Sequence, residues 1–283
     1  MKERLTTGAI GIAILLLVFV FYKTPVLNAS VALVGILAVH EIFTVTHNLQ
    51  NRGLYGICLV FAATLPFLHY VSDHRVGGVY AFCFLTAVFV YLLARHGKFP
   101  MEQAALCFTL TLLTSYALSC IAWLRDIYTG GAALRDEALF YLVLVFAGAW
   151  VTDAGAWLFG ITMGKHKLSP NISPKKTVEG AVGGILATVV FFAAAGFVYQ
   201  AYLHAGGSAA RVEFPALGAL ALLCAVFSML GDLSASVLKR QHGYKDFGNL
   251  LPGHGGILDR FDSLLFVAPL LLFYLGFFRV VGL

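Results

Sequence analysis

Long apolar runs separated by short polar segments dominate the amino-acid sequence. A helix that crosses a bilayer needs about 20 mostly apolar residues, and nine runs of about this length are bounded by charged residues, glycines or prolines. The runs are Leu5–Tyr22, Val26–Val45, Leu54–Val71, Val76–Ala94, Ala104–Leu124, Ala138–Gly160, Val178–Leu203, Phe214–Leu238 and Asp262–Gly282. Helices are the expected form, because unpaired backbone amides are costly in lipid and no barrel-type alternation is visible. The pattern predicts an all-α, polytopic integral membrane protein with about nine transmembrane helices.

Composition excludes the other broad classes of protein. Hydrophobic residues make up 60% of the chain and charged residues 12%, against about 45–50% and 25% in soluble domains. A mean hydropathy of +0.86 is too high for a short chain to hide from water in one core. The five cysteines lie in apolar runs without CxxC spacing, which favours packing over disulfide or zinc chemistry. Lys2 and Arg4 could begin a signal peptide, but a second apolar run follows almost at once, so we expect the first run to remain a helix.

The basic residues predict the orientation of the chain. Along a nine-crossing path, 13 of the 19 lysines and arginines fall on the side of the N-terminus and 6 on the other side. The positive-inside rule therefore predicts a cytoplasmic N-terminus and a C-terminus outside. The net charge of +5 is explained by this topology and by attraction to anionic lipid heads, so no nucleic-acid partner is expected.

The predicted organisation is one continuous membrane domain with two halves. Residues 1–137 contain helices one to five and form a lipid cavity or scaffold, and their Glu41 is expected to be structural. Residues 138–283 contain helices six to nine and two long polar segments, which are the expected catalytic loops on the cytoplasmic side. Chemistry is therefore expected after residue 150.

The first polar segment, residues 160–180, is basic and contains two prolines. It does not match the phosphate-loop pattern GxxxxGK[ST], because its glycines are one residue too close and a histidine takes the Ser/Thr place. Ser173, Lys175 and Lys176 precede a helix that is expected to begin near Val178. The positive end of this helix, with lysines beside it, predicts a phosphate seat. The alternative is that the lysines only fix the topology.

The second polar segment, residues 231–263, is richer in charge. Asp232 lies in an apolar run, where a carboxylate costs at least about 2.5–3.5 kcal/mol at mid-helix depth unless a cation or a wet cavity meets it. Helical spacing places Asp232, Ser236, Lys239 and Arg240 on one face. The sequence therefore predicts a polar stripe along this helix that leads to the cytoplasmic side of the membrane.

Paired carboxylates in this segment indicate a cation site. Asp259 and Asp262 are three positions apart and are expected to share a face at the start of the last helix. Asp232 and Asp259 could bracket Mg²⁺, which prefers carboxylate, water and phosphate oxygens. Four cationic side chains accompany them, namely Lys239, Arg240, Lys245 and Arg260. Metal and fixed cations are what phosphoryl or nucleotidyl transfer requires.

Other residues have two readings each. Gly255 and Gly256 would let the backbone approach a phosphate closely. His254 between the glycines either contacts substrate or caps the loop by hydrogen bonding. Asp246 either binds metal or nucleotide or only pairs with the lysine before it. Asp153 either lines the cavity that contains Asp232 and Asp259 or makes a helix–helix hydrogen bond.

The stretch S-x-L-K-R-x4-K-D-x-G-x2-L-P-x-H-G-G-I-x-D-R-F-D, Ser236 to Asp262, resembles the motif of the phosphatidate cytidylyltransferase family, also called CDP-diacylglycerol synthases. Ile172–Gly180 and the helix that contains Asp153 resemble the same family. The resemblance implies that CTP and phosphatidic acid react to give CDP-diacylglycerol and pyrophosphate. It also implies that Asp232 and Asp259 hold the metal, with Mg²⁺ and a monovalent cation such as K⁺ as candidates, and that the protein is a homodimer.

These arguments assign the candidate residues to two groups. The catalytic group, with Asp232 and Asp259 as metal ligands, comprises Asp232, Asp246, Asp259, Lys239, Arg240, Lys245 and Arg260. The substrate-binding group comprises Ser173, Lys175, Lys176, Asp153, His254, Gly255, Gly256 and Asp262. The expected location is the bacterial inner membrane with the active site on the cytoplasmic side. The alternatives are a CTP-dependent enzyme for another lipid phosphate and an ion-coupled secondary transporter.

Overall fold

The computed structural model describes residues 2–71, 75–96, 100–129, 137–251, 253 and 255–282. In chain order the elements are α1 (Lys2–Val20), α2 (Val26–Val45), α3 (Arg52–Val71), α4 (Arg75–Ala94), α5 (Met101–Tyr128), α6 (Ala138–Met163), β1 (Lys167–Ser169), β2 (Ser173–Thr177), α7 (Val178–Ala205), β3 (Arg211–Val212), α8 (Phe214–Gln241), α9 (Leu258–Phe261), α10 (Leu264–Phe277) and β4 (Val281–Gly282). Two short antiparallel pairs, β1 with β2 and β3 with β4, add a little strand to the predicted all-α class. The first pair forms where Pro170 and Pro174 interrupt helix formation.

Apolar helices of membrane-spanning length confirm the polytopic character of the chain. Within the described residues, seven stretches are long and apolar enough to cross a bilayer, namely Val26–Val45, Gly77–Ala94, Met101–Tyr128, Ala138–Met163, Val178–Ala205, Phe214–Gln241 and Leu258–Phe277. Thr6–Val20 and Arg52–Leu68 are shorter apolar helices. The chain is therefore a helical protein of the polytopic membrane type, while the number of nine crossings and the sidedness of the termini remain predictions.

The chain divides into two compact units. The first comprises Met1–Leu139 and Lys239–Phe261, and the second comprises Phe140–Leu238 and Asp262–Leu283. Most of the second polar segment thus groups with the N-terminal helices, although it is distant from them in sequence. The predicted roles of residues 1–137 and 138–283 remain predictions.

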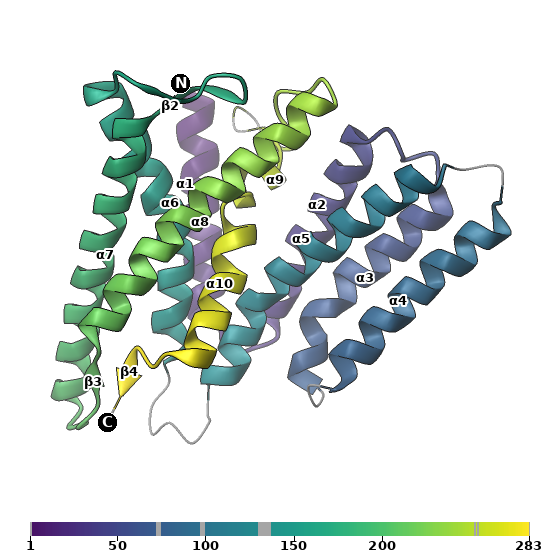
Figure 1. Cartoon of the computed structure of the whole chain (residues 1–283). Coiled ribbons are helices and arrows are strands. Elements are labelled where there is room, and N and C mark those ends of the chain that lie inside the picture. Colours follow the sequence, from purple (N-terminus) through teal and green to yellow (C-terminus); the bar gives the residue numbers. More distant parts are fainter. Residues whose placement is uncertain are drawn as a thin grey trace. The chain divides into compact units, whose positions relative to one another are not determined.

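Helices α2, α3 and α5 form the core of the first unit, with α4 against α3 and α5 (Figure 1). Val39, Phe43, Phe61 and Leu118 are among the buried side chains that fill it. Apolar packing of this kind excludes lipid from between the helices and fixes their register.

A buried polar cluster ties the ends of these helices together. The Arg125 guanidinium donates to the carbonyl oxygens of Tyr22 at 2.6 Å and Thr24 at 3.0 Å, and to the Asn28 side chain. Asn28 in turn donates to the carbonyl oxygen of Pro66 at 2.7 Å. The cluster therefore joins α2, α3, α5 and the connection between α1 and α2.

Small residues hold the second unit together. A Cβ at Gly184 of α7 would lie 2.7 Å from the Thr152 carbonyl oxygen of α6, so only glycine allows this approach. Beside it, the buried hydroxyl groups of Thr152 and Thr188 are 2.6 Å apart. Close helix contacts with internal hydrogen bonds are typical of membrane helices. These contacts fix α7 against α6, and they therefore also fix the point at which strand β2 joins α7.

The last predicted helix, Asp262–Gly282, is wrong in its bounds. The chain turns at Asp262 and Ser263, α10 ends at Phe277, and Val281 pairs with Val212 in a strand. The turn has a physical cause, since the Ser263 N–H donates to Asp262 Oδ1 at 2.8 Å and therefore does not extend a helix. The spacing predicted that Asp259 and Asp262 share a face of one helix. This prediction is wrong, because Asp259 lies on α9 and Asp262 lies in the turn that follows it.

Candidate active site

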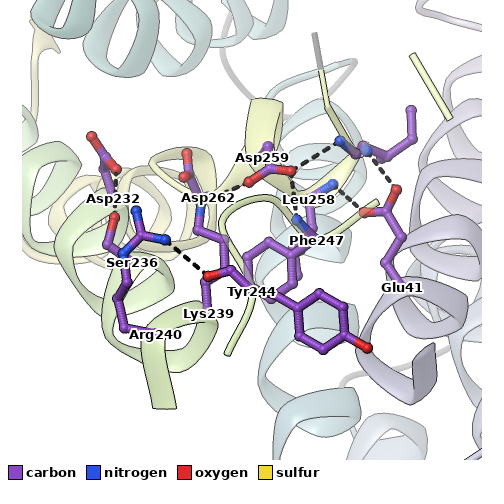
Figure 2. A network of polar contacts seen from close by, with 12 residues as sticks. Glu41, Asp232, Ser236, Lys239, Arg240, Tyr244, Phe247, Leu258, Asp259 and Asp262 are labelled. Carbon is purple, nitrogen blue, oxygen red and sulfur yellow. Dashed lines mark hydrogen bonds and ion pairs between the residues drawn. The ribbon is translucent and has the colours of Figure 1, made fainter. Parts of the chain in front are cut away.

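Asp259, one of the two predicted metal ligands, lies on the short helix α9 of the first unit. Its Oδ1 accepts a hydrogen bond from Lys239 Nζ at 2.6 Å. Its Oδ2 accepts the backbone N–H groups of Phe247 at 2.8 Å and Gly256 at 2.9 Å. Figure 2 shows the carboxylate turned toward both the lysine and the loop. Asp259 therefore joins the last turn of α8 to both ends of the segment 247–256.

Lys239 is a buried cation with two partners. Its side chain is 9% exposed and that of Asp259 is 5% exposed, and its ammonium group also lies 5.1 Å from the centre of the Phe247 ring. A buried charge is tolerated when an opposite charge and further polar or aromatic contacts replace water. The pair is thus a fixed electrostatic feature within the motif.

Glycines give the loop before α9 its shape. Gly253 and Gly255 have φ values of +75° and +84°, a backbone region that other residues rarely adopt. The Leu251 N–H donates to the Gly255 carbonyl oxygen at 2.9 Å and closes a tight turn. A Cβ at Gly255 would meet Asp259 Oδ2 at 3.0 Å, so the backbone lies directly against this carboxylate. The predicted contact of His254 falls outside the described residues.

Glu41 of α2 is a partner of the motif that sequence reasoning missed. The side chain is buried, and its carboxylate accepts the backbone N–H groups of Ile257 at 2.7 Å and Leu258 at 2.8 Å (Figure 2). The sequence indicated a structural role for Glu41, but it gave no sign of a partner more than 200 positions away. The only available signal was the presence of an acid in an apolar helix, which requires some partner.

The remaining predicted cations of this unit lie at its surface. Arg240, Lys245 and Arg260 are exposed, and Arg240 donates to the Tyr244 carbonyl oxygen at 2.9 Å. Asp246 is also exposed. Exposed basic side chains can reach a phosphate group that arrives from water.

Asp232, the other predicted metal ligand, belongs to the second unit and lies on α8. Its Oδ2 forms an ion pair with Lys176 Nζ, and its Oδ1 accepts the Ser236 hydroxyl at 3.4 Å. Both members of the ion pair are about a quarter exposed, at 27% for Asp232 and 23% for Lys176. The structure thus brings together one predicted metal ligand and one predicted substrate-binding lysine.

The strand β2 presents the predicted phosphate-binding residues just before α7. Ser173 and Lys176 are half-buried, whereas Lys175 is exposed. The predicted helix start at Val178 is confirmed, because Thr177 caps α7 by accepting the Gly180 N–H at 3.1 Å. Lys175 and Lys176 therefore stand within three residues of a helix N-terminus.

Glu179 in the first turn of α7 fixes the preceding connection. Its carboxylate accepts the backbone N–H groups of Lys165 at 3.0 Å and His166 at 3.2 Å, and contacts His166 Nδ1 at 2.6 Å. The hairpin of β1 and β2 is therefore held at its base.

Asp153 and Asp262 meet at Ser263, a residue that the sequence had not singled out. The Ser263 hydroxyl donates to Asp153 Oδ2 at 3.0 Å, and its N–H donates to Asp262 Oδ1. A Cβ at Gly231 of α8 would lie 2.6 Å from the Asp262 carbonyl oxygen. Asp153 thus makes an interhelical hydrogen bond, which was one of its two predicted readings.

Asp232 and Asp259 are single carboxylates, and each is paired with a lysine. Among the described residues, no group of three or more His, Cys, Asp or Glu side chains could hold a metal ion. A cation at Asp232 or Asp259 would therefore complete its shell with water and substrate oxygens. Mg²⁺ is commonly bound in this way, through one or two carboxylates plus phosphate.

Comparison with known proteins shows a consistent relationship. The model of the family described as "Cytidylyltransferase family" matches residues 2–278. The chain is 33% identical over 285 residues to a phosphatidate cytidylyltransferase of Bacillus subtilis, with 98% of each chain covered. It is 31% identical over 275 residues to the protein of the same name from Staphylococcus haemolyticus, covering 96% of this chain and 97% of that one. A Staphylococcus epidermidis protein of this name is 33% identical over 276 residues, with 96% and 97% covered.

Proposed function

The chain belongs to the cytidylyltransferase family, and from this premise we propose that it transfers the cytidylyl group of CTP to phosphatidic acid, giving CDP-diacylglycerol and pyrophosphate. The observation that carries the proposal is the similarity, over nearly the full length, to proteins named phosphatidate cytidylyltransferase. The site geometry supports it, since the motif residues are organised around Asp259 and Lys239.

The proposed reaction needs no amino-acid nucleophile. A phosphate oxygen of phosphatidic acid attacks the α-phosphorus of CTP, a new P–O bond forms, and the bond to the β-phosphate oxygen breaks to release pyrophosphate. Both reactants are anions, so the protein must overcome their repulsion and stabilise the leaving pyrophosphate. The exposed cations Lys175, Arg240, Lys245 and Arg260 are suited to this task.

We assign the metal-binding role to Asp232 and Asp259, with Mg²⁺ as the ion and a monovalent cation such as K⁺ bound in addition to it. A bound Mg²⁺ would neutralise phosphate charge and polarise the reacting phosphorus. Each carboxylate has a lysine partner, Lys176 for Asp232 and Lys239 for Asp259.

Ser173, Lys176, Asp153, Asp262 and the backbone of Gly255 and Gly256 complete the proposed substrate-binding set. The hydrogen-bonded positions of Asp153 and Asp262 at Ser263 support a role in shaping the site. His254 and Asp246 remain candidates for contact with the nucleotide.

The proposed setting is a bacterial plasma membrane with the catalytic face toward the cytoplasm, where CTP is available. The excess of basic residues on one side supports this orientation. The protein is proposed to span the membrane about nine times and to act as a homodimer. Light scattering of the detergent-purified protein tests the dimer.

Purified protein in detergent with CTP, Mg²⁺ and a panel of lipid phosphates tests the function. We expect pyrophosphate release and a CDP-lipid with phosphatidic acid, and loss of both when a chelator removes Mg²⁺. The panel includes a polyprenyl phosphate and an ether-linked phosphatidic acid. A preference for one of these would make that lipid, and not phosphatidic acid, the acceptor of the cytidylyl group. Solute uptake by vesicles without CTP turnover would favour a transporter.

A further inference from the structure

Glu41 links the N-terminal half of the chain to the motif. It lies near the C-terminal end of α2, is 4% exposed, and is followed in α2 only by apolar residues and Thr44. A buried carboxylate is costly unless hydrogen bonds replace water. Its carboxylate oxygens accept the N–H groups of Ile257 and Leu258, one for each oxygen. The charge of Glu41 is thus directed at the backbone of the motif.

The contact is sterically specific on both sides. A Cβ at Gly256 would lie 2.6 Å from both carboxylate oxygens of Glu41, and one at Gly248 would lie 3.0 Å from Oε1. Real Cβ atoms do not come as close as 2.6 Å, and one at 3.0 Å would be a tight contact, so glycine at both positions allows the loop backbone to lie against the carboxylate. The contact between Glu41 and the loop therefore depends on the backbone conformation of the loop as well as on the charge of the carboxylate.

Two carboxylates hold three consecutive amides of this loop. Asp259 accepts the N–H of Gly256, and Glu41 accepts those of Ile257 and Leu258. The next two residues along the chain are Asp259 and Arg260. The direction in which their side chains leave the backbone therefore depends on the amides that Glu41 holds.

We propose that Glu41 is a positioning residue for cytidylyl transfer. It holds Ile257 and Leu258 so that Asp259, the proposed cation ligand, and Arg260, a proposed phosphate partner, are correctly oriented for the reaction. The proposal rests on the proposed function and goes beyond it by giving the N-terminal helices a role in the chemical step. Glu41 itself does not touch the reacting atoms.

Substitutions at Glu41 separate positioning from general stability. Glu41→Ala removes both acceptors, whereas Glu41→Gln keeps the size and one oxygen acceptor. We expect Glu41→Ala to lower kcat about 100-fold with a much smaller change in KM for CTP, since a small displacement of reacting groups has an effect of this order. Glu41→Gln is expected to recover part of kcat. The rate of hydrogen exchange at the Ile257 and Leu258 amides should rise in both variants, and more in Glu41→Ala than in Glu41→Gln.

Two matched controls accompany these variants. Thr44→Val changes a neighbouring side chain of α2 whose hydroxyl donates only within the helix, to the His40 carbonyl oxygen at 2.8 Å, and should leave kcat unchanged. Gly248→Ala places a methyl group against Glu41 without changing any charge and should lower kcat. Gly56→Ala, where a Cβ would meet nothing within 4 Å, should not.

The outcomes distinguish a failure of the positioning role of Glu41 from a failure of the proposed function. Wild-type kcat in folded Glu41→Ala would overturn the positioning role, as would unchanged hydrogen exchange at Ile257 and Leu258 in that variant. A loss of activity that only follows the fraction of unfolded protein would also overturn it. If the wild-type protein releases no pyrophosphate from CTP and phosphatidic acid, the proposed function fails, while hydrogen exchange still decides whether Glu41 holds the loop.

Discussion

At the scale of single residues, each proposed metal ligand carries its own lysine, but the two ion pairs have different surroundings. Lys239 and Asp259 are nearly buried, whereas Lys176 and Asp232 are about a quarter exposed. Removal of one partner from a buried pair leaves a charge without compensation, while a pair in contact with water loses little. The two lysines should therefore contribute very differently to stability.

Substitution of each lysine by methionine tests this difference. Lys239→Met should lower the free energy of unfolding by about 3 kcal/mol, because Asp259 would stay buried without a counter-charge. Lys176→Met should lower it by less than about 1 kcal/mol. Reversible SDS titration followed by circular dichroism measures both values. The double variant Lys239→Met/Asp259→Asn should recover part of the loss, and equal losses in the two single variants would contradict the argument.

At the scale of elements, local signals in the sequence predicted most helices and failed where distant groups decide the backbone. The start of α7 at Val178 was predictable because a proline-containing basic segment ends at the capping residue Thr177. The break at Asp262 and Ser263 was not, because it depends on the contacts of two side chains: Asp262 accepts the Ser263 N–H, and the Ser263 hydroxyl donates to Asp153 of α6.

The candidate site shows the same limit. Asp232, Lys239 and Asp259 were recognisable from charge and spacing within one segment. The partners of these residues could not be paired from sequence, since Lys176 and Asp232 are distant in the chain and meet only through tertiary structure. Glu41 could be recognised as an unusual acid, but its acceptance of two motif amides depends on how α2 packs.

Helix α7 offers a direct test of sidedness. It has 28 residues and is about 42 Å long at 1.5 Å per residue, which exceeds a hydrocarbon core of about 30 Å. Asn171 and Ala209 are exposed positions beyond its two ends. In right-side-out vesicles, a membrane-impermeant maleimide should modify Ala209→Cys and not Asn171→Cys, relative to the parent protein. The reverse pattern would contradict the predicted orientation.

For the molecule as a whole, the proposed catalytic and binding residues are divided between the two compact units. Lys239, Lys245 and Asp259 belong to the first unit, while Lys176 and Asp232 belong to the second. Neither unit alone contains both proposed metal ligands. We therefore expect activity to require both Asp232 and Asp259.

The rate of CDP-diacylglycerol formation from CTP and phosphatidic acid, in purified Asp232→Asn and Asp259→Asn variants, tests this claim most directly. Asparagine keeps the size of each side chain and one oxygen acceptor but removes the charge that binds a cation. Each variant, folded and eluting from size exclusion as the wild type does, is expected to fall to the background rate at every Mg²⁺ concentration. Near-normal turnover in either variant would contradict this expectation.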